Sequence, residues 1–147
     1  MARWLSPETA EVFFAQHDAD QRHGYHAALT VIAAGVDEVG VITAALLHDI
    51  GKRHARLGVA GRSLASVMIL LGLPLGERMT AYRDHGLIGA RELGALGAPS
   101  LAIDFAMHHH GTRPPTIDPE TWDLLVRADQ PPKTPSSSQA RITSKPI

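Results

Sequence analysis

The chain has no cysteine, almost no net charge and no long apolar run, and each absence excludes a class of protein. Without cysteine there is no disulfide, no thiolate zinc site and no cysteine nucleophile. A formal net charge of -1 gives no reason to expect binding to nucleic acid or to an anionic membrane. The most apolar run, SVMILLGL at 66–73, is far shorter than the roughly 20 residues of a membrane-spanning helix.

What remains is the composition of an ordinary globular protein. At 147 residues, the chain is long enough for one domain with a sizeable core. Its apolar content of 44% and charged content of 20% are typical of soluble proteins. The first residues, MARWLSPETAEVFF, lack the apolar core of a secretory signal peptide. We therefore expect a soluble, cytoplasmic protein.

Start and stop signals predict helices joined by short breaks. Ser6 before a proline is typical of a helix N-terminus, and Gly35 is the type of residue at which a helix ends. Asp18 or Asp20 is suited to cap the second helix, and Asp37 the third. The predicted helices span 7–16, about 18–34, 38–49, 62–71, 77–96 with a break near 84–86, 99–110 and 119–128, while 51–61 is predicted to be a loop.

These elements leave no place for a sheet. No run of alternating β-branched residues is present. We therefore predict an all-α fold, a single-domain helical bundle over residues 1–130. Residues 131–147 are rich in Pro, Ser and Lys, and we expect a flexible C-terminal tail there because this composition cannot bury an apolar face.

Histidine and aspartate recur in a series across most of the chain. Its members are His23, His48, Asp49, His85, the run 108–110 and Asp129. Their nitrogen and oxygen donors suit divalent metals. His48 and Asp49 end a helix predicted to be buried, and Gly51 allows the backbone to turn there. The series predicts one buried metal centre, and hydrolysis at phosphorus as its chemistry.

Several members of the series also have an ordinary structural interpretation. His26 lies three positions after His23 and faces roughly the same way, so either or both can be the ligand. At least one histidine of 108–110 should face solvent. Asp129, judged by its position in the chain only, is also compatible with an ordinary surface acid. Three basic residues after Asp49 fit phosphate contacts and solvated loop charges equally well: Lys52, Arg53 and His54.

The order H…HD…H…H…D, with AALLHDIGK at 44–52, resembles the HD superfamily of metal-dependent phosphohydrolases over roughly residues 19–130. Four further segments carry the resemblance: DQRHGYHAALTV at 20–31, HGLIGARELGALG at 85–97, DFAMHHHG at 104–111 and LLVRADQ at 124–130. The resemblance selects His23 over His26, and it also selects His85, His108 and Asp129.

The resemblance implies an HD-type helical bundle around a divalent metal, which can be Mn, Fe, Co, Ni, Zn or Mg. The implied ligands are His23, His48, Asp49 and Asp129. The implied holders of a second metal, or of the substrate phosphate, are His85 and His108. We therefore expect catalytic roles for Asp49, His85 and His108, and we expect Lys52 to contact phosphate.

The function expected on this basis is hydrolysis of a nucleotide or other small phosphoester by metal-activated water. A stringent-response synthetase-hydrolase is disfavoured because its acidic pair after the HD motif is absent. A cyclic-dinucleotide phosphodiesterase of the HD-GYP kind is disfavoured because HHHGTRPP lacks the GYP segment. The alternative is a non-catalytic metal- or nucleotide-binding module that regulates a partner. The sequence does not identify the substrate, the metal or the oligomeric state.

Overall fold

The structure, a computed structural model, describes residues 3–130, with the side chain of Val59 left out. Residues 131–147, for which a flexible tail is predicted, lie outside the described part. The helices are α1 (Pro7–Phe14), α2 (Asp18–Ala33), α3 (Val39–Leu47), α4 (Lys52–Ala55), α5 (Val59–Leu70), α6 (Glu77–Arg83), α7 (His85–Ala95), α8 (Ser100–His108) and α9 (Pro119–Asp129). Residues 3–130 contain no strand, and the predicted all-α fold is confirmed.

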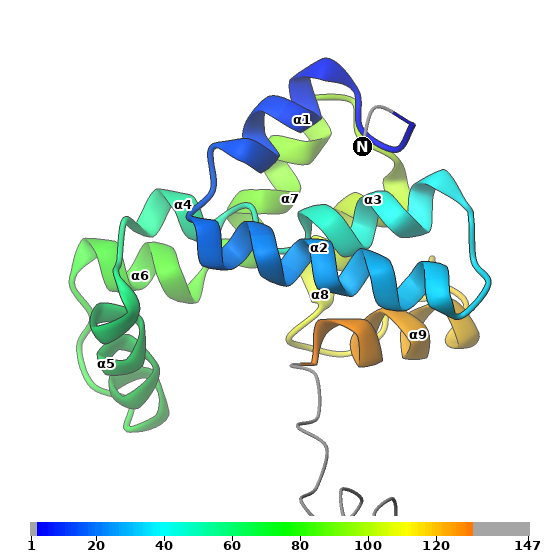
Figure 1. Ribbon diagram of the computed structural model, residues 1–147. Coiled ribbons are helices and arrows are strands. Elements are labelled where there is room, and N and C mark those ends of the chain that lie inside the picture. Colours follow the sequence, from blue (N-terminus) through cyan, green and yellow to red (C-terminus); the bar gives the residue numbers. More distant parts are fainter. Residues whose placement is uncertain (1–2, 131–147) are drawn as a thin grey trace, which may run out of the picture.

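The body of the bundle is built around α3. Helix α2 packs on one side of α3 and α8 on the other, α7 packs on α8, and α9 contacts both α2 and α3 (Figure 1). Every residue from Val41 to Ile50 is buried, so the end of α3 and the turn after it lie in the core. No described helix has the length and apolar character needed to cross a membrane.

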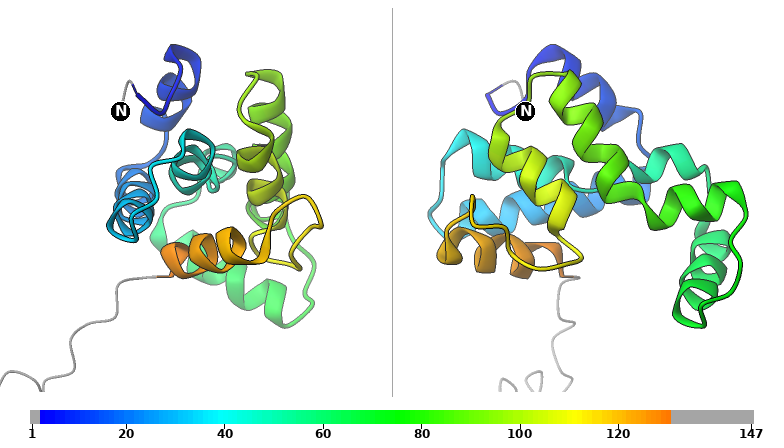
Figure 2. Two further views of the ribbon diagram at one scale, coloured as in Figure 1. Left: turned by 90° about the vertical axis from the view of Figure 1, so that its right-hand side faces the viewer. Right: turned by 180° about the vertical axis from the view of Figure 1, so that it is seen from behind.

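Helices α4, α5 and α6 extend from this body. Helix α4 contacts α6 and α7, and α5 packs on α6. The view from behind shows α5 projecting away from the rest of the bundle (Figure 2). This arrangement leaves much of the surface of α5 without a covering element.

Three local features differ from the sequence-based expectations. Residues 51–61 are not entirely loop, because Lys52–Ala55 forms α4, which ends at Arg56 in a left-handed conformation. His17, rather than Asp18 or Asp20, caps α2 through its Nδ1, which accepts from the backbone N–H of Ala19, while Asp20 pairs with Arg62. The third helix has Glu38 at its N-cap, while Asp37, expected there, pairs with the side chain of Arg3.

Candidate metal centre

The turn between α3 and α4 places His48 and Asp49 in the interior of the protein. Their exposed fractions are only 1% and 3%. Gly51 makes this position possible, because a Cβ atom there would overlap the carbonyl oxygen of His85. The absence of a side chain at Gly51 therefore lets α7 approach the HD pair closely.

A first group of candidate ligands lies on one side of Asp49. It consists of His23, His48, Asp49 and Asp129. Oδ1 of Asp129 lies 2.8 Å from the Nε2 atoms of both His23 and His48, and these two nitrogens are 3.2 Å apart. Oδ2 of Asp49 lies 3.6 Å from His48 Nε2 and 3.8 Å from His23 Nε2. Helices α2 and α9 and the turn after α3 thus bring together residues more than 100 positions apart.

A second group lies on the other side of the same carboxylate. It consists of Asp49, His85, His109 and His110. Oδ1 of Asp49 lies 3.2 Å from His85 Nε2 and 3.5 Å from His109 Nε2. The Nε2 atom of His85 is 3.3 Å from that of His109 and 3.2 Å from that of His110. Asp49 therefore turns one oxygen to each group.

Backbone contacts determine which ring nitrogens carry protons. The Nδ1 atoms of His48, His85 and His109 donate to the carbonyl oxygens of Ala45, Tyr82 and Ala106. A carbonyl oxygen only accepts, so each Nδ1 carries a proton and each neutral ring directs a bare Nε2 lone pair inward. Such a second contact commonly orients a metal-binding imidazole.

Three inward lone pairs and two carboxylates require positive charge between them. A second proton on each imidazole of the second group would place like charges within about 3.3 Å of one another, which is unfavourable in a buried site. Oδ1 of Asp49 is buried and has no hydrogen-bond partner among the described residues. A cation satisfies this oxygen and the facing nitrogens together, so the donor set fits divalent metals.

The charges of the site act on its carboxyl groups and on His48. Burial pushes the pKa of Asp49 upward, but the charge of His48 and contacts with His109 and His85 hold this pKa well below its usual range. Burial also opposes ionisation of Asp129, yet the close contacts of its carboxylate with His23 and His48 lower its pKa. Burial lowers the pKa of His48, but the charges of Asp49 and Asp129 outweigh it and raise this pKa overall.

The structure brings together five of the residues singled out in the sequence. These are His23, His48, Asp49, His85 and Asp129. Lys52 lies beside them, with Nζ 2.5 Å from Oδ2 of Asp49. His26 is exposed on α2 and belongs to neither group. Arg53 and His54, considered for phosphate contacts, both pair with Glu92.

His108 is not brought to the site, and its place is taken by the next two histidines. His109 is buried at the end of α8, and His110 follows it as an exposed member of the second group. The physical reason is the period of α8: buried Ala102, Phe105 and Ala106 continue to position 109. His108 lies off this face. The apolar period of 102–106 was a signal in the sequence that favoured His109.

Comparisons with known proteins identify no relative of this chain. No family model, no curated protein and no solved structure matches the chain. Residues 3–130 form an all-helical fold with a buried His/Asp centre whose side chains could hold a metal ion.

Proposed function

We propose that this chain is a metal-dependent phosphohydrolase of the HD type that acts on a nucleotide or another small phosphoester. One observation carries the proposal: buried Asp49 presents one oxygen to each of two groups of histidine and carboxylate ligands. A carboxylate shared by two neighbouring cation positions is suited to a two-metal site for phosphoryl chemistry. The order of ligands along an all-helical chain, which resembles the HD superfamily, supports the same conclusion.

The residues divide naturally between two ions. The first group would hold one ion through His23, His48, Asp49 and Asp129, and the second would hold another through Asp49, His85, His109 and His110. When bound, such ions polarise phosphoryl oxygens and lower the pKa of water toward neutrality. Neutral imidazoles suit this role because they bind a cation without cancelling its charge.

Differences in exposure between the ligands support one direction of approach for the proposed substrate. The side chains of His48 and His109 are each only 1% exposed, whereas those of His23 and Asp129 are 30% and 23% exposed. His110 is exposed as well. The buried residues form the floor of the centre, and the outer residues form its open side. A phosphate group would enter from that side.

In the reaction, a bond forms between a water oxygen and phosphorus while the bond from phosphorus to the leaving oxygen breaks. One water proton ends on the leaving oxygen of an ester, or in solvent when the leaving group is itself a phosphate, and the other remains on the released phosphate. Negative charge on the phosphoryl oxygens must be stabilised in the transition state. Lys52 contributes a positive charge at this point, and its contact with Asp49 Oδ2 orients both side chains.

Turnover by the purified chain tests the proposal. Phosphate release from a panel of nucleotides and phosphomonoesters should require added divalent metal and should be lost in Asp49→Asn. His26→Ala, on the exposed side of α2, should keep most of the activity. Metal or nucleotide binding without turnover on any member of the panel would instead favour a regulatory binding module.

A further inference from the structure

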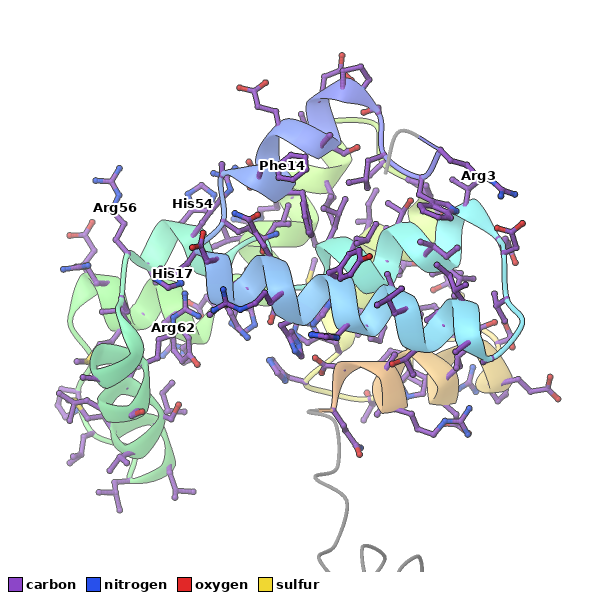
Figure 3. The ribbon with its side chains drawn as sticks, viewed as in Figure 1. Arg3, Phe14, His17, His54, Arg56 and Arg62 are labelled. Atoms are coloured by element: carbon purple, nitrogen blue, oxygen red, sulfur yellow. The ribbon has the colours of Figure 1, made fainter. Side chains whose placement is uncertain are left out.

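A cationic pocket of about 340 Å³ lies beside the candidate metal centre. It is bordered by the start of α2, by α4 and by the start of α5. Five basic or imidazole side chains line it: His17, Lys52, Arg53, Arg56 and Arg62. No carboxylate is among its lining residues. Figure 3 shows His17 and Arg62 together at this junction, with Arg56 extending outward from the end of α4.

Three of the cations are held in place by carboxylates outside the pocket. Lys52 pairs with Asp49 and Arg53 with Glu92. Arg62 forms two hydrogen bonds with Asp20, of 2.5 and 2.6 Å, and a third with the carbonyl oxygen of Leu57. The wall of the pocket is therefore organised before any ligand binds, which reduces the entropy lost on binding.

The remaining two side chains keep donors available for a ligand. Nδ1 of His17 accepts from the backbone N–H of Ala19, so the proton of the neutral ring is on Nε2. Arg56 makes no side-chain hydrogen bond or ion pair within the described part of the chain. Its backbone has φ of +49°, an unusual conformation for a non-glycine residue. The fold holds a free guanidinium at the rim at some conformational cost.

The positive surface continues beyond Arg56. A second hollow, of about 600 Å³, is lined by Arg53, His54, Arg56 and Arg78, and Glu77 is its acidic member. Burial, followed by the charges of Arg53 and Arg56, lowers the pKa of His54. Clustered guanidinium groups are suited to phosphate oxygens, which they can bind in a bidentate manner.

We propose that this pocket binds a second phosphate group of the substrate, so that the substrate class is an oligophosphate with two or more linked phosphoryl groups. The inference rests on the proposed function for the position of the reacting phosphate. Lys52 provides the connection, because it contacts Asp49 in the metal centre and also lines the pocket. A phosphate chain can therefore run from the metal centre past Lys52 to Arg56.

Calorimetric titration of inorganic tripolyphosphate into the full-length protein, in buffer without added metal, tests the pocket separately from turnover. Arg56→Gln should weaken binding by about tenfold, since it removes a charge-assisted contact. Arg3→Gln is the matched control, because Arg3 lies far from the pocket at the start of the chain and pairs with Asp37 (Figure 3). Equal affinity in wild type and Arg56→Gln would overturn the proposal.

A kinetic comparison gives a second readout. Arg56→Gln should lower kcat/KM for oligophosphates by about tenfold and leave that for a phosphomonoester unchanged. Equal losses for both substrate types would overturn the assignment of a second phosphate. If the protein binds tripolyphosphate through Arg56 but hydrolyses no substrate, the anion pocket is supported and the proposed hydrolase activity is refuted. If the protein hydrolyses phosphoesters but does not bind tripolyphosphate, the hydrolase activity is supported and the anion pocket is refuted.

An independent observation concerns the outer surface of α5. Leu64, Val67, Leu70 and Leu71 are 53%, 51%, 85% and 63% exposed. Ile69 and Leu73 are 37% and 46% exposed, but they line a hollow beside α6 together with Thr80 and Arg83. Residues 63–75 include no charged side chain, and Arg62, the one charge on α5, turns to Asp20. The projecting helix thus presents an uncharged apolar surface, which we call the α5 face and define by Leu64, Val67, Leu70 and Leu71.

The size and pattern of the α5 face fit a second copy of the same chain. If a fully exposed Leu or Val presents about 200 Å², these four residues expose roughly 500 Å², well over half of the 800 Å² that each partner contributes to a standard interface. Leu64, Val67 and Leu71 follow the alternating three- and four-residue spacing of helices that pack side by side. An uncharged stripe is complementary to itself, as a two-fold interface requires.

Other occupants fit this face less well. A helix that lies on a membrane usually carries Lys or Arg along its polar side, and α5 has only the engaged Arg62. The segment 131–147 is rich in Pro, Ser and Lys and has few apolar residues to offer. We infer that two chains associate through their α5 faces to form a symmetric dimer.

The mass in solution tests the dimer. Light scattering of wild type should give twice the 15.8 kDa of one chain, and Leu70→Glu or Val67→Glu should give the monomer mass with unchanged helical circular dichroism. Phe14→Glu is the matched control, because Phe14 is a 59% exposed apolar residue on α1. A monomeric wild type, with or without binding to vesicles of phosphatidylcholine and phosphatidylserine, would overturn the inference. So would a dimer that survives both α5 variants.

The absence of cysteine provides a direct geometric check. Val67→Cys should form an intermolecular disulfide under mild oxidation because position 67 is near the middle of the α5 face. Phe14→Cys should stay monomeric under the same conditions. Equal crosslinking of the two variants would show collision rather than a specific interface, and would overturn the inference.

Discussion

Nε2 of His48 lies 2.8 Å from Oδ1 of Asp129, although 81 positions separate the two residues in the chain. Nδ1 of His48 already donates to the carbonyl oxygen of Ala45, so the neutral ring meets this carboxylate with a lone pair. The contact is unfavourable unless positive charge lies between the two atoms or on the ring. A bound metal ion would supply that charge.

His48→Ala and Asp49→Ala should lose bound metal and thermal stability together. Metal that binds only the folded chain adds to its stability, by about 2.7 kcal/mol at a concentration a hundredfold above Kd. Calorimetric melting of wild type and variants, with metal and with chelator, measures the effect. His26→Ala is the control and should melt like wild type. If both variants keep stoichiometric metal, the centre is assigned wrongly.

The adjacent histidines at the end of α8 should behave differently from each other. His109→Ala should reduce turnover at least tenfold, equivalent to roughly 1.4 kcal/mol of barrier, because His109 is buried in the second group. His108→Ala should retain turnover near that of wild type. Steady-state kinetics of the two variants shows which of the two adjacent histidines acts in turnover. A larger loss in His108→Ala than in His109→Ala would assign the role to His108.

His85→Ala should separate the two ions. The first group has four protein ligands without His85 and should still hold about one ion per chain. Turnover should nevertheless fall at least about tenfold, since the second position acts on the charged transition state. Metal analysis and kinetics on one sample give both values. Loss of all metal in this variant would mean that the two groups are not independent.

Metal affinity should fall as the pH is lowered. An imidazole must be neutral to bind metal, and the carboxylates beside His48 raise its pKa, so protons compete for this ring from a higher pH than for an ordinary histidine. Affinity should therefore rise with pH through this raised pKa and then level off. Titration calorimetry in buffers of different ionisation enthalpy should show proton release on binding at acidic pH. A pH-independent affinity would exclude His48 as a ligand.

Gly51→Ala should destabilise the protein by at least about 2 kcal/mol, because the new methyl group would overlap the carbonyl oxygen of His85 and push α7 from the HD pair. Gly76→Ala is the matched control, since no atom lies within 4 Å of a Cβ at Gly76 and its φ is -70°. Urea unfolding of the metal-free proteins measures both changes. Equal stabilities would contradict the close approach of α7.

Much of this organisation follows from local features of the sequence. Caps and breakers such as Ser6 and Gly35 mark helix ends because their effects act within one turn. The resemblance selected His108, whereas the buried period of α8 continues to position 109 and places His109 in the second group. The position of Asp49 between the two groups depends on how α7 and α9 pack around the turn after α3, which local sequence patterns do not determine. The cationic pocket likewise depends on tertiary pairing, such as that of Arg62 with Asp20.

The most direct test of the account is the metal stoichiometry of the wild-type protein. The purified chain, loaded in turn with manganese, iron, cobalt, nickel and zinc and then freed of excess, should retain two ions per chain by plasma mass spectrometry for at least one of these metals. One ion per chain throughout would contradict the second position built from His85, His109 and His110. No retained ion of any kind would contradict the metal centre itself.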